Sequence, residues 1–440
     1  MKILGIIVEY NPFHNGHLYH ISRAKEITKA DYIIAVMSGH FLQRGEPAII
    51  NKWARTKMAL NAGVDLVIEI PFVFSTQDAN GFAFGAVKLL DSLRIVHYLC
   101  FGCETNDLNV LYSISNFLHI EPEKFKELIK HYSKNGDEFP KTRSRSLCEY
   151  HKILGIDGLK KVSPSELSKL LKHPNNILAL EYIKHLLNLN SKMTPLPIKR
   201  IGASYHQKNI EGKISSATSI RNEIINNFTS SKTNLFSLND KIKSTIPLSG
   251  FHVLEKELKE GRGPVTFSSY QQSIFAILRR MSSEDISRIH GVTEGLENRI
   301  KKASLRSYHV EQLLNSIKTR RYTRTKIQRI ILHIMLNLCK EDITIFNKCG
   351  PLYARILGFS KKGKILLRTI KKNSSLPLIS KLSNYLRKTI STGDNDIQNN
   401  LIKMLDYDIL STDMFVLGYK KGEDRIARLD FTHKIVIKEE

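Results

Sequence analysis

Two histidines lie three positions apart near the start of the chain, in the segment Asn11-Pro12-Phe13-His14-Asn15-Gly16-His17. Nucleotidyl transfer requires a triphosphate held in line while negative charge builds on its oxygens. Two imidazoles at a helix N-terminus meet this need, because the helix adds partial positive charge and Gly16 lets the backbone approach the phosphates. We therefore predict that His14 and His17 are catalytic and face a triphosphate.

A second segment, ISSATSIR at 214–221, has the composition of a phosphate-binding helix start. Hydroxyls and backbone amides at a helix N-terminus are donors, and Arg221 adds a charged one. An ordinary Ser/Thr helix cap has the same residue types. We predict phosphate contacts from Ser216, Thr218 and Arg221, so that both segments bind one nucleotide.

Two groupings could be read as metal or redox sites. Cys100 and Cys103 have the CxxC spacing, but no second pair completes a zinc site, and on a strand their side chains point to opposite faces. His14 and His17 have no third ligand nearby in the sequence. We predict no protein metal site, and expect Mg²⁺ only as the companion of ATP. Five cysteines, an odd and sparse set, suit a reducing compartment.

The elements around these segments alternate between apolar strands and helical patterns, as in βαβ units. The strands are expected at 2–9, 32–37, 65–70 and 95–101, with helices from about 17 and at 52–61 and 81–92. Right-handed crossovers make this an open parallel sheet with ligands at the carboxyl ends of the strands. A further strand at 195–201 returns to the sheet.

The chain is therefore expected to be α/β in its first part and mainly helical afterwards. Residues 1–228 are expected to form a domain that binds a triphosphate, with a parallel sheet and a helical insertion at about 107–187. A polar linker at 229–244 leads to a helical, basic region at 245–440 that is expected to bind nucleic acid.

The charge is strongly basic, with a formal net charge of +25 and a pI near 9.7. Residues 301–440 hold 28 Lys and Arg against 13 Asp and Glu. A single basic run is usually a solvated helix face, but the imbalance across the whole region favours contact with a nucleic-acid backbone. The densest run, and the expected contacts with nucleic acid, are Lys318, Arg320, Arg321, Arg324, Lys326 and Arg329. No transmembrane or signal segment is seen, so a cytoplasmic protein is expected.

The HxGH turn together with the Ser/Thr-x-Ile-Arg helix start resembles the nucleotidylyltransferase superfamily. Longer stretches resemble the bacterial tRNA(Met) cytidine acetate ligase family across nearly the whole chain. They are IVEYNPFHNGHLYH at 7–20, MSGHFLQRGEPAIINKWARTKMAL at 37–60, PNNILALEYIK at 174–184, IKRIGASYH at 198–206, ISSATSIR at 214–221, SIKTRRYTRTKIQRIILHIML at 316–336 and ARILGFSKKGK at 354–364.

The resemblance implies an ATP-dependent ligase that makes acetyl-adenylate and acetylates N4 of the wobble cytidine of elongator tRNA(Met), giving N4-acetylcytidine. Its expected partners are acetate and this tRNA, with no stable protein partner evident. Gln43 and Arg44 are candidates for the acyl-adenylate pocket. The residues implied to bind ATP are Ile7, Val8, Glu9, Tyr10, Asn11, Pro12, Phe13, His14, Asn15, Gly16, His17, Leu18, Tyr19, His20, Gly102, Asn175 and Arg200.

The sequence departs from the family pattern at three positions. His40 stands where Asn is expected, Asn51 where Asp is expected, and Ser204 where Gly is expected. Two other functions remain open at this point. A small-molecule adenylyltransferase would explain the first domain but leave the basic region without a role. A non-catalytic tRNA-binding protein would not need the intact histidines and Arg221.

Overall fold

The computed structural model describes residues 1–439 except 202–208, 211, 231–237, 294, 384 and 386–395. One sheet runs through the molecule in the order β5-β4-β1-β2-β3-β6-β7, and β8 pairs with β6. The first five strands are parallel, as expected from the alternating pattern. The strands are β1 (Ile3–Val8), β2 (Tyr32–Ser38), β3 (Leu66–Ile70), β4 (Tyr98–Cys103), β5 (Thr194–Lys199), β6 (Ala354–Ser360), β7 (Leu378–Ile379) and β8 (Val436–Lys438).

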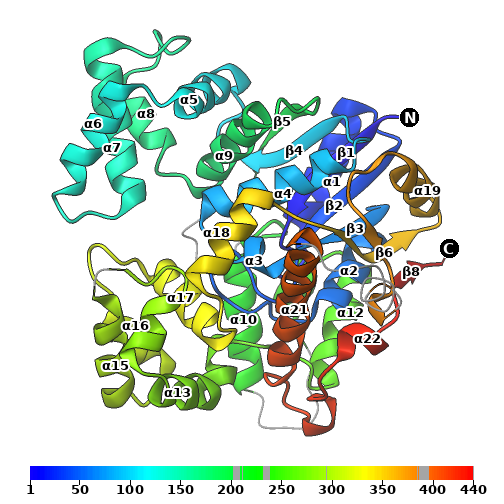
Figure 1. Cartoon of the computed structure of the whole chain (residues 1–440). Helices are drawn as coiled ribbons and strands as arrows, with labels where there is room; N and C mark the ends of the chain where they lie inside the picture. The colour runs from blue at the N-terminus through cyan, green and yellow to red at the C-terminus, as the bar shows by residue number, and fades with distance from the viewer. Residues whose placement is uncertain are drawn as a thin grey trace.

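Helices cover both faces of this sheet (Figure 1). Side chains alternate across each strand, so Ile34 and Val36 of β2 belong to one core while Ile33 and Ala35 belong to the other. The helices of the α/β part are α1 (Asn15–Thr28), α2 (Lys52–Asn61), α3 (Phe72–Ser75), α4 (Ala79–Ser92), α9 (Pro174–Asn188), α10 (Ala217–Ser230), α11 (Asp240–Thr245) and α12 (Leu248–Lys259).

Two helical lobes flank the sheet on the left of Figure 1. The upper lobe is the expected insertion, with α5 (Leu108–Ile120), α6 (Glu123–Ser133), α7 (Phe139–Leu154) and α8 (Pro164–Leu170). The lower lobe carries α13 (Gln271–Arg280), α15 (Leu296–Arg306), α16 (Val310–Ile317) and α17 (Arg324–Met335). The other C-terminal helices are α14 (Ser283–Arg288), α18 (Lys340–Cys349), α19 (Gly363–Asn373), α21 (Asp396–Val416) and α22 (Leu429–Thr432).

The C-terminal half is mainly helical, but it also extends the sheet, which the sequence did not reveal. Strand β6 pairs antiparallel with β3, and β7 and β8 pair with β6. Strands β3 and β6 are almost 300 residues apart in the chain, and such a long-range pairing has no local signal in the amino-acid sequence. The expected division at 228 and 244 stays a prediction. No helix in the described part has the length and apolar character needed to cross a bilayer.

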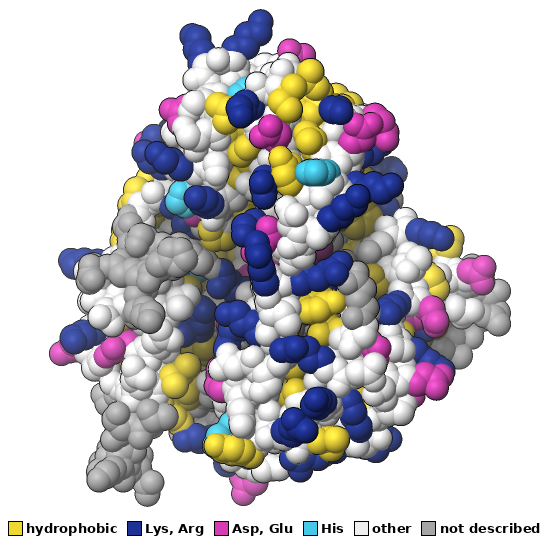
Figure 2. All heavy atoms as spheres, turned by 90° about the vertical axis from the view of Figure 1, so that its left-hand side faces the viewer, with side chains coloured by type: hydrophobic (Ala, Val, Ile, Leu, Met, Phe, Trp, Pro, Cys, Tyr) yellow, Lys and Arg dark blue, Asp and Glu magenta, His cyan; other side chains and the backbone are white. Residues whose placement is uncertain are grey.

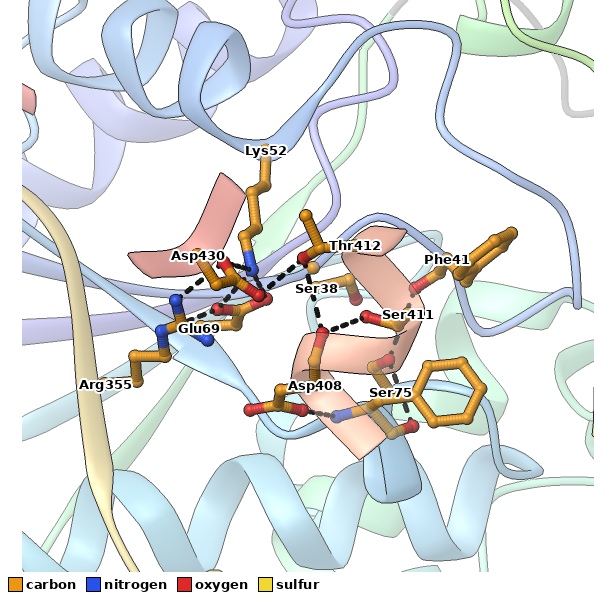
Figure 3. A network of polar contacts seen from close by, with 12 residues as sticks. Ser38, Phe41, Lys52, Glu69, Ser75, Arg355, Asp408, Ser411, Thr412 and Asp430 are labelled. Carbon is orange, nitrogen blue, oxygen red and sulfur yellow. Dashed lines mark hydrogen bonds and ion pairs between the residues drawn. The ribbon is translucent and has the colours of Figure 1, made fainter. Parts of the chain in front are cut away.

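A buried group of charges joins the C-terminal segments to the parallel strands of the sheet (Figure 3). Lys52 Nζ lies 2.9 Å from Glu69 Oε1 and 2.9 Å from Asp430 Oδ1. The guanidinium of Arg355, on β6, lies 2.7 Å from the same Asp430 oxygen and 3.5 Å from Glu69 Oε2. All four side chains are buried, so each charge depends on its partners for stabilisation.

Candidate active site

A cavity of about 890 Å³ opens at the carboxyl ends of the parallel strands, where the topology predicts a ligand. The order of the strands in the sheet determines the order in which residues line the cavity. Arg200 and Gly102 come from the ends of β5 and β4, His14 and His17 follow β1, and Gln43 follows β2. Figure 2 shows the side of the molecule that carries α7 and α16, where Lys and Arg side chains gather around a hollow and outnumber Asp and Glu.

The HxGH turn is a helix cap built from its own histidines. His14 is the N-cap of α1, and its Nδ1 accepts a hydrogen bond from the backbone N–H of Gly16 at 3.0 Å. His17 Nδ1 accepts from the backbone N–H of His14 at 3.3 Å. The two rings stack with centroids 3.8 Å apart, and Tyr10 packs edge-on against His17.

These hydrogen bonds decide which nitrogen carries the proton in the neutral rings. Because Nδ1 accepts in both rings, the proton lies on Nε2, which remains as the donor of each ring. Burial, with Arg200 and Arg221 adding to it, lowers the pKa of His14 to about 3. Burial and the neighbouring His14 and Arg200 also lower the pKa of His17 well below its usual value. Both imidazoles are therefore neutral hydrogen-bond donors at pH 7.

The second phosphate-binding segment lies on the same cavity. Ser216 caps α10 through its Oγ, which accepts from Ser219 N at 3.0 Å. Arg221 donates to the backbone oxygen of Asn11 at 2.9 Å and lies 3.8 Å from Glu46. Ser216, Thr218 and Arg221 all line the cavity, so the structure brings together the two segments predicted to share one nucleotide.

Three more residues from the family pattern meet at the β4 and β5 side of the cavity. A Cβ at Gly102 would lie 3.5 Å from the Arg200 side chain. The glycine therefore leaves space in the cavity beside the Arg200 guanidinium. Asn175 donates to Glu104 at 2.6 Å from the first turn of α9. His20 lies 3.3 Å from Cys100 Sγ, and burial together with Arg200 lowers the pKa of His20 to about 4.

Four residues of the implied ATP set lie off the cavity wall. Phe13 is in the core, and the Asn15 side chain donates to the backbone oxygens of Lys213 and Ser244, each at 2.9 Å. Asn15 thus holds the loop that precedes α10, while Pro12 is buried and Leu18 packs against the core. The other members line the cavity: Ile7, Val8, Glu9, Tyr10, Asn11, His14, Gly16, His17, Tyr19, His20, Gly102, Asn175 and Arg200. Their contact with ATP stays a prediction.

The loop after β2 is fixed from several sides. Gln43 donates its backbone N–H to Glu9 Oε1 at 2.9 Å, and burial raises the pKa of that carboxyl. The buried Arg55 donates to the backbone oxygens of Glu9 at 2.6 Å, Ser38 at 3.0 Å and Gly39. Arg55 thus joins the ends of β1 and β2. Its position inside a helix gave no sign of this role in the sequence.

The basic run divides between the surface and the cavity. Lys318 and Arg320 are exposed, and Arg320 lies 2.7 Å from Asp137 of the insertion. Arg324 is partly exposed and pairs with Glu311 at 2.6 Å. Arg321, Lys326 and Arg329 instead line the cavity.

Arg329 is the residue of this run that differs most from a surface contact. It donates to the backbone oxygen of Gln43 at 3.3 Å, and burial lowers its pKa. Gly45, with φ of +73°, packs against its backbone so closely that a Cβ would lie 2.3 Å from Arg329 N. A direct tRNA contact from Arg329 stays a prediction, since in this structure it positions the loop after β2.

The cysteine pair behaves as the strand geometry predicts. Cys100 belongs to the core on one face of the sheet and Cys103 to the core on the other. Burial raises the pKa of the Cys103 thiol to about 12, so the thiolate is disfavoured. Within the described residues, no group of three or more His, Cys, Asp or Glu is placed to hold a metal ion.

Two of the three departures from the family pattern can be located. Asn51 is the N-cap of α2, accepting from Ala54 N at 2.8 Å and donating to Glu257 at 2.7 Å, away from the cavity. His40 is buried and stacks on Phe415 with centroids 4.2 Å apart. Neither of its ring nitrogens has a hydrogen-bond partner among the described residues. Ser204 lies outside the described residues.

Comparison with known proteins agrees with this geometry. A family model described as HIGH nucleotidyl transferase matches residues 1–429. The tRNA(Met) cytidine acetate ligase of Acetivibrio thermocellus is 43% identical to the chain over 440 residues, covering 99% of this chain and 100% of that protein. The chain belongs to the tRNA(Met) cytidine acetate ligase family. The family member from Halothermothrix orenii is 42% identical over 436 residues and covers 99% of each chain.

Solved structures extend the likeness to three dimensions. Thermotoga maritima TmcAL bound with alpha-thio ATP matches with a TM-score of 0.90 and 35% identity over 99% of both chains. An apo form of the same protein matches with a TM-score of 0.91 and 36% identity, again over 99% of both chains. The family resemblance and the α/β fold are thus confirmed. The match includes the C-terminal region, which a small-molecule adenylyltransferase would leave without a role.

Proposed function

We propose that the protein is an ATP-dependent ligase that acetylates N4 of the wobble cytidine of elongator tRNA(Met), giving N4-acetylcytidine. The observation that carries this proposal is the stacked pair His14 and His17 on a nucleotide-sized cavity, in a chain whose full-length relatives are named tRNA(Met) cytidine acetate ligase. The cytoplasm is the expected compartment, in keeping with the free cysteines.

The reaction has two balanced steps. An acetate oxygen attacks the α-phosphorus of ATP, and pyrophosphate leaves. The N4 amine then attacks the acetyl carbon, the bond from that carbon to the AMP oxygen breaks, and AMP and one proton are released. Acetate is a poor acyl donor, and AMP supplies the leaving group that it lacks.

The residues of the cavity suit the first step. The neutral rings of His14 and His17 each offer an Nε2–H to phosphate oxygens whose charge rises during attack, and Arg200 and Arg221 supply fixed positive charge. Hydrogen bonds hold both rings before ATP arrives, so little reorganisation is needed. Gln43 and Arg44 line the side of the cavity toward β2, where acetate would approach.

Magnesium is proposed as the companion of ATP. Because the described residues form no cage of three or more metal ligands, the ion would be held mainly by phosphate oxygens and water. When bound, it would neutralise part of the phosphate charge. None of the steps assigned to protein residues depends on it.

The decisive assay supplies purified protein with ATP, radiolabelled acetate and bacterial tRNA. We expect ATP-dependent label in elongator tRNA(Met), recovered as N4-acetylcytidine after nuclease digestion. Label confined to small molecules would favour an adenylyltransferase. Tight tRNA binding with no label anywhere would favour a non-catalytic tRNA-binding protein.

A further inference from the structure

Two parts of the chain share the cavity. The α/β part carries the residues assigned to ATP. Asp78, at the start of α4 in the same α/β part, lines the cavity together with His290 before α15 and Lys326 in the first turn of α17, and these three residues are called the opposite wall. The volume of about 890 Å³ is near the upper end of the range, roughly 300–1,000 Å³, for a site that holds one drug-sized ligand. None of the residues assigned to ATP lies on the opposite wall.

Strand order indicates which substrate meets this wall. The nucleotide residues follow β5, β4 and β1, and the next strand, β2, leads into the loop with Gln43. Arg329 of α17 donates to the Gln43 backbone, and Gly45 packs directly on α17. The opposite wall therefore adjoins the loop after β2, beside the strands whose ends carry the residues assigned to ATP. The acceptor of an acyl group joined to the α-phosphate must approach from a position next to the nucleotide.

The chemistry of the wall matches a cytosine base. Cytosine offers an N4 amine as donor, with N3 and O2 as acceptors. A carboxylate such as Asp78 accepts from N4, an ammonium such as that of Lys326 donates to O2 or N3, and an imidazole gives a stacking surface. Burial lowers the pKa of His290 to about 4, although Asp78 opposes the shift, so its ring is neutral at pH 7.

We infer that Asp78, His290 and Lys326 form the subsite for the cytosine that receives the acetyl group. The inference rests on the proposed function. Because the subsite is inside a cavity, the base must leave the anticodon stack to enter it, as in other enzymes that act on a single base. Arg321 lines the cavity and is exposed, so it is placed to contact the phosphates beside the flipped nucleotide.

The test separates the two half-reactions in the full-length protein. Asp78→Asn keeps the side-chain oxygen that caps α4 through Gly81 N. Lys326→Met keeps an unbranched apolar side chain but removes the ammonium, which lies 4.8 Å from the centroid of the Tyr322 ring. A control, Lys302→Met, removes an exposed lysine of α15 away from the cavity. Acetate-dependent ATP–pyrophosphate exchange reports activation, and acetyl transfer to tRNA reports the complete reaction.

We expect exchange within about twofold of wild type in all three variants. Transfer, as kcat/KM for tRNA, should fall about tenfold or more in Asp78→Asn and Lys326→Met only, the usual worth of a base-edge contact. His290→Ala provides a third variant if one of these fails to fold. Unchanged transfer, or a parallel loss of exchange and transfer, would overturn the subsite. A wild-type protein without acetate-dependent exchange would refute the proposed function itself, and the subsite with it.

A second measurement distinguishes base recognition from general attraction to RNA. Wild-type protein should bind tRNA with cytidine at the acceptor position several-fold more tightly than the same tRNA with uridine there, since uridine lacks the N4 amine. Asp78→Asn should lose most of this preference, while Lys302→Met keeps it. An equal preference in Asp78→Asn and wild type would contradict the assignment of Asp78.

Discussion

His14 uses one ring nitrogen for the fold and leaves the other for chemistry. Its Nδ1 caps α1 through Gly16 N, and the same bond fixes the proton on Nε2. The residue types and spacing of this turn could be predicted from the sequence. The tautomer could not, because it depends on which backbone amide each ring meets.

Replacing His14 by Asn tests this division of roles. Asn is a good N-cap, so the stability of α1 should be kept, while the imidazole donor to phosphate is lost. We expect the acetate-dependent exchange rate to fall about 100-fold or more, the scale of removing one preorganised donor. His14→Ala should lose the cap as well and melt at a lower temperature. Exchange at the wild-type rate in His14→Asn would exclude His14 from phosphate binding.

The buried histidines also predict how stability changes with pH. The pKa values of His14 and His20 are lowered to about 3 and about 4 from the usual 6.5. Between these values the unfolded chain binds more protons than the folded protein, so the free energy of unfolding falls as pH drops below about 6.5. The melting temperature should therefore decrease from pH 7.5 to pH 5. His20→Leu should show a shallower decrease, and an identical slope would contradict the burial of His20 in its neutral form.

Among the elements, the parallel strands were predictable and the antiparallel extension was not. Short apolar runs between helical patterns predict strands at residues 2–9, 32–37 and 65–70. Strand β6 is equally apolar, but its partner β3 lies far away in the sequence. The position of Arg329 in the cavity could not be predicted either. The sequence shows that the run is basic, but it does not show which side of α17 faces the cavity.

Asn51 departs from the family pattern at a position that stabilises helix α2 and lies away from the cavity. Its side chain caps α2 and donates to Glu257 of α12, which Arg262 holds with two hydrogen bonds. Asn51→Ala should lower the free energy of unfolding by about 1–2 kcal/mol through loss of the cap, as measured by chemical denaturation. Asn51→Ser, which keeps the cap alone, should recover part of this loss. A change in the exchange rate without a change in stability would instead assign Asn51 to the reaction.

Across the molecule, the buried charges link the C-terminal strands to the N-terminal strands of the same sheet. Arg355 of β6 reaches Glu69 of β3 and Asp430 of α22, and Lys52 of α2 reaches the same two carboxylates (Figure 3). The predicted basic, helical region is therefore also a structural part of the sheet. Sequence composition revealed its charge but not these four buried partners.

Arg355→Met would leave two buried carboxylates with one cation. We expect a loss of about 3–5 kcal/mol in the free energy of unfolding, the usual cost of breaking a buried ion pair from one side. The variant should unfold at a lower denaturant concentration when unfolding is followed by fluorescence, and at a lower temperature when it is followed by calorimetry. Arg425→Met serves as the control and should change stability far less, because the exposed guanidinium of Arg425 donates to the backbone oxygens of Tyr419 and Lys420 and contacts no buried carboxylate in the described structure. Equal stabilities would show that the charges do not hold the sheet together.

In the proposed reaction, a carboxylate oxygen displaces pyrophosphate in the part of the cavity lined by His14 and His17. Acetate labelled with ¹⁸O in both oxygens tests it directly in a complete reaction with ATP and tRNA. Because the bridging oxygen stays with phosphorus when the amine takes the acetyl group, the account predicts one ¹⁸O in each AMP released. Unlabelled AMP, or label in phosphate or pyrophosphate, would contradict it.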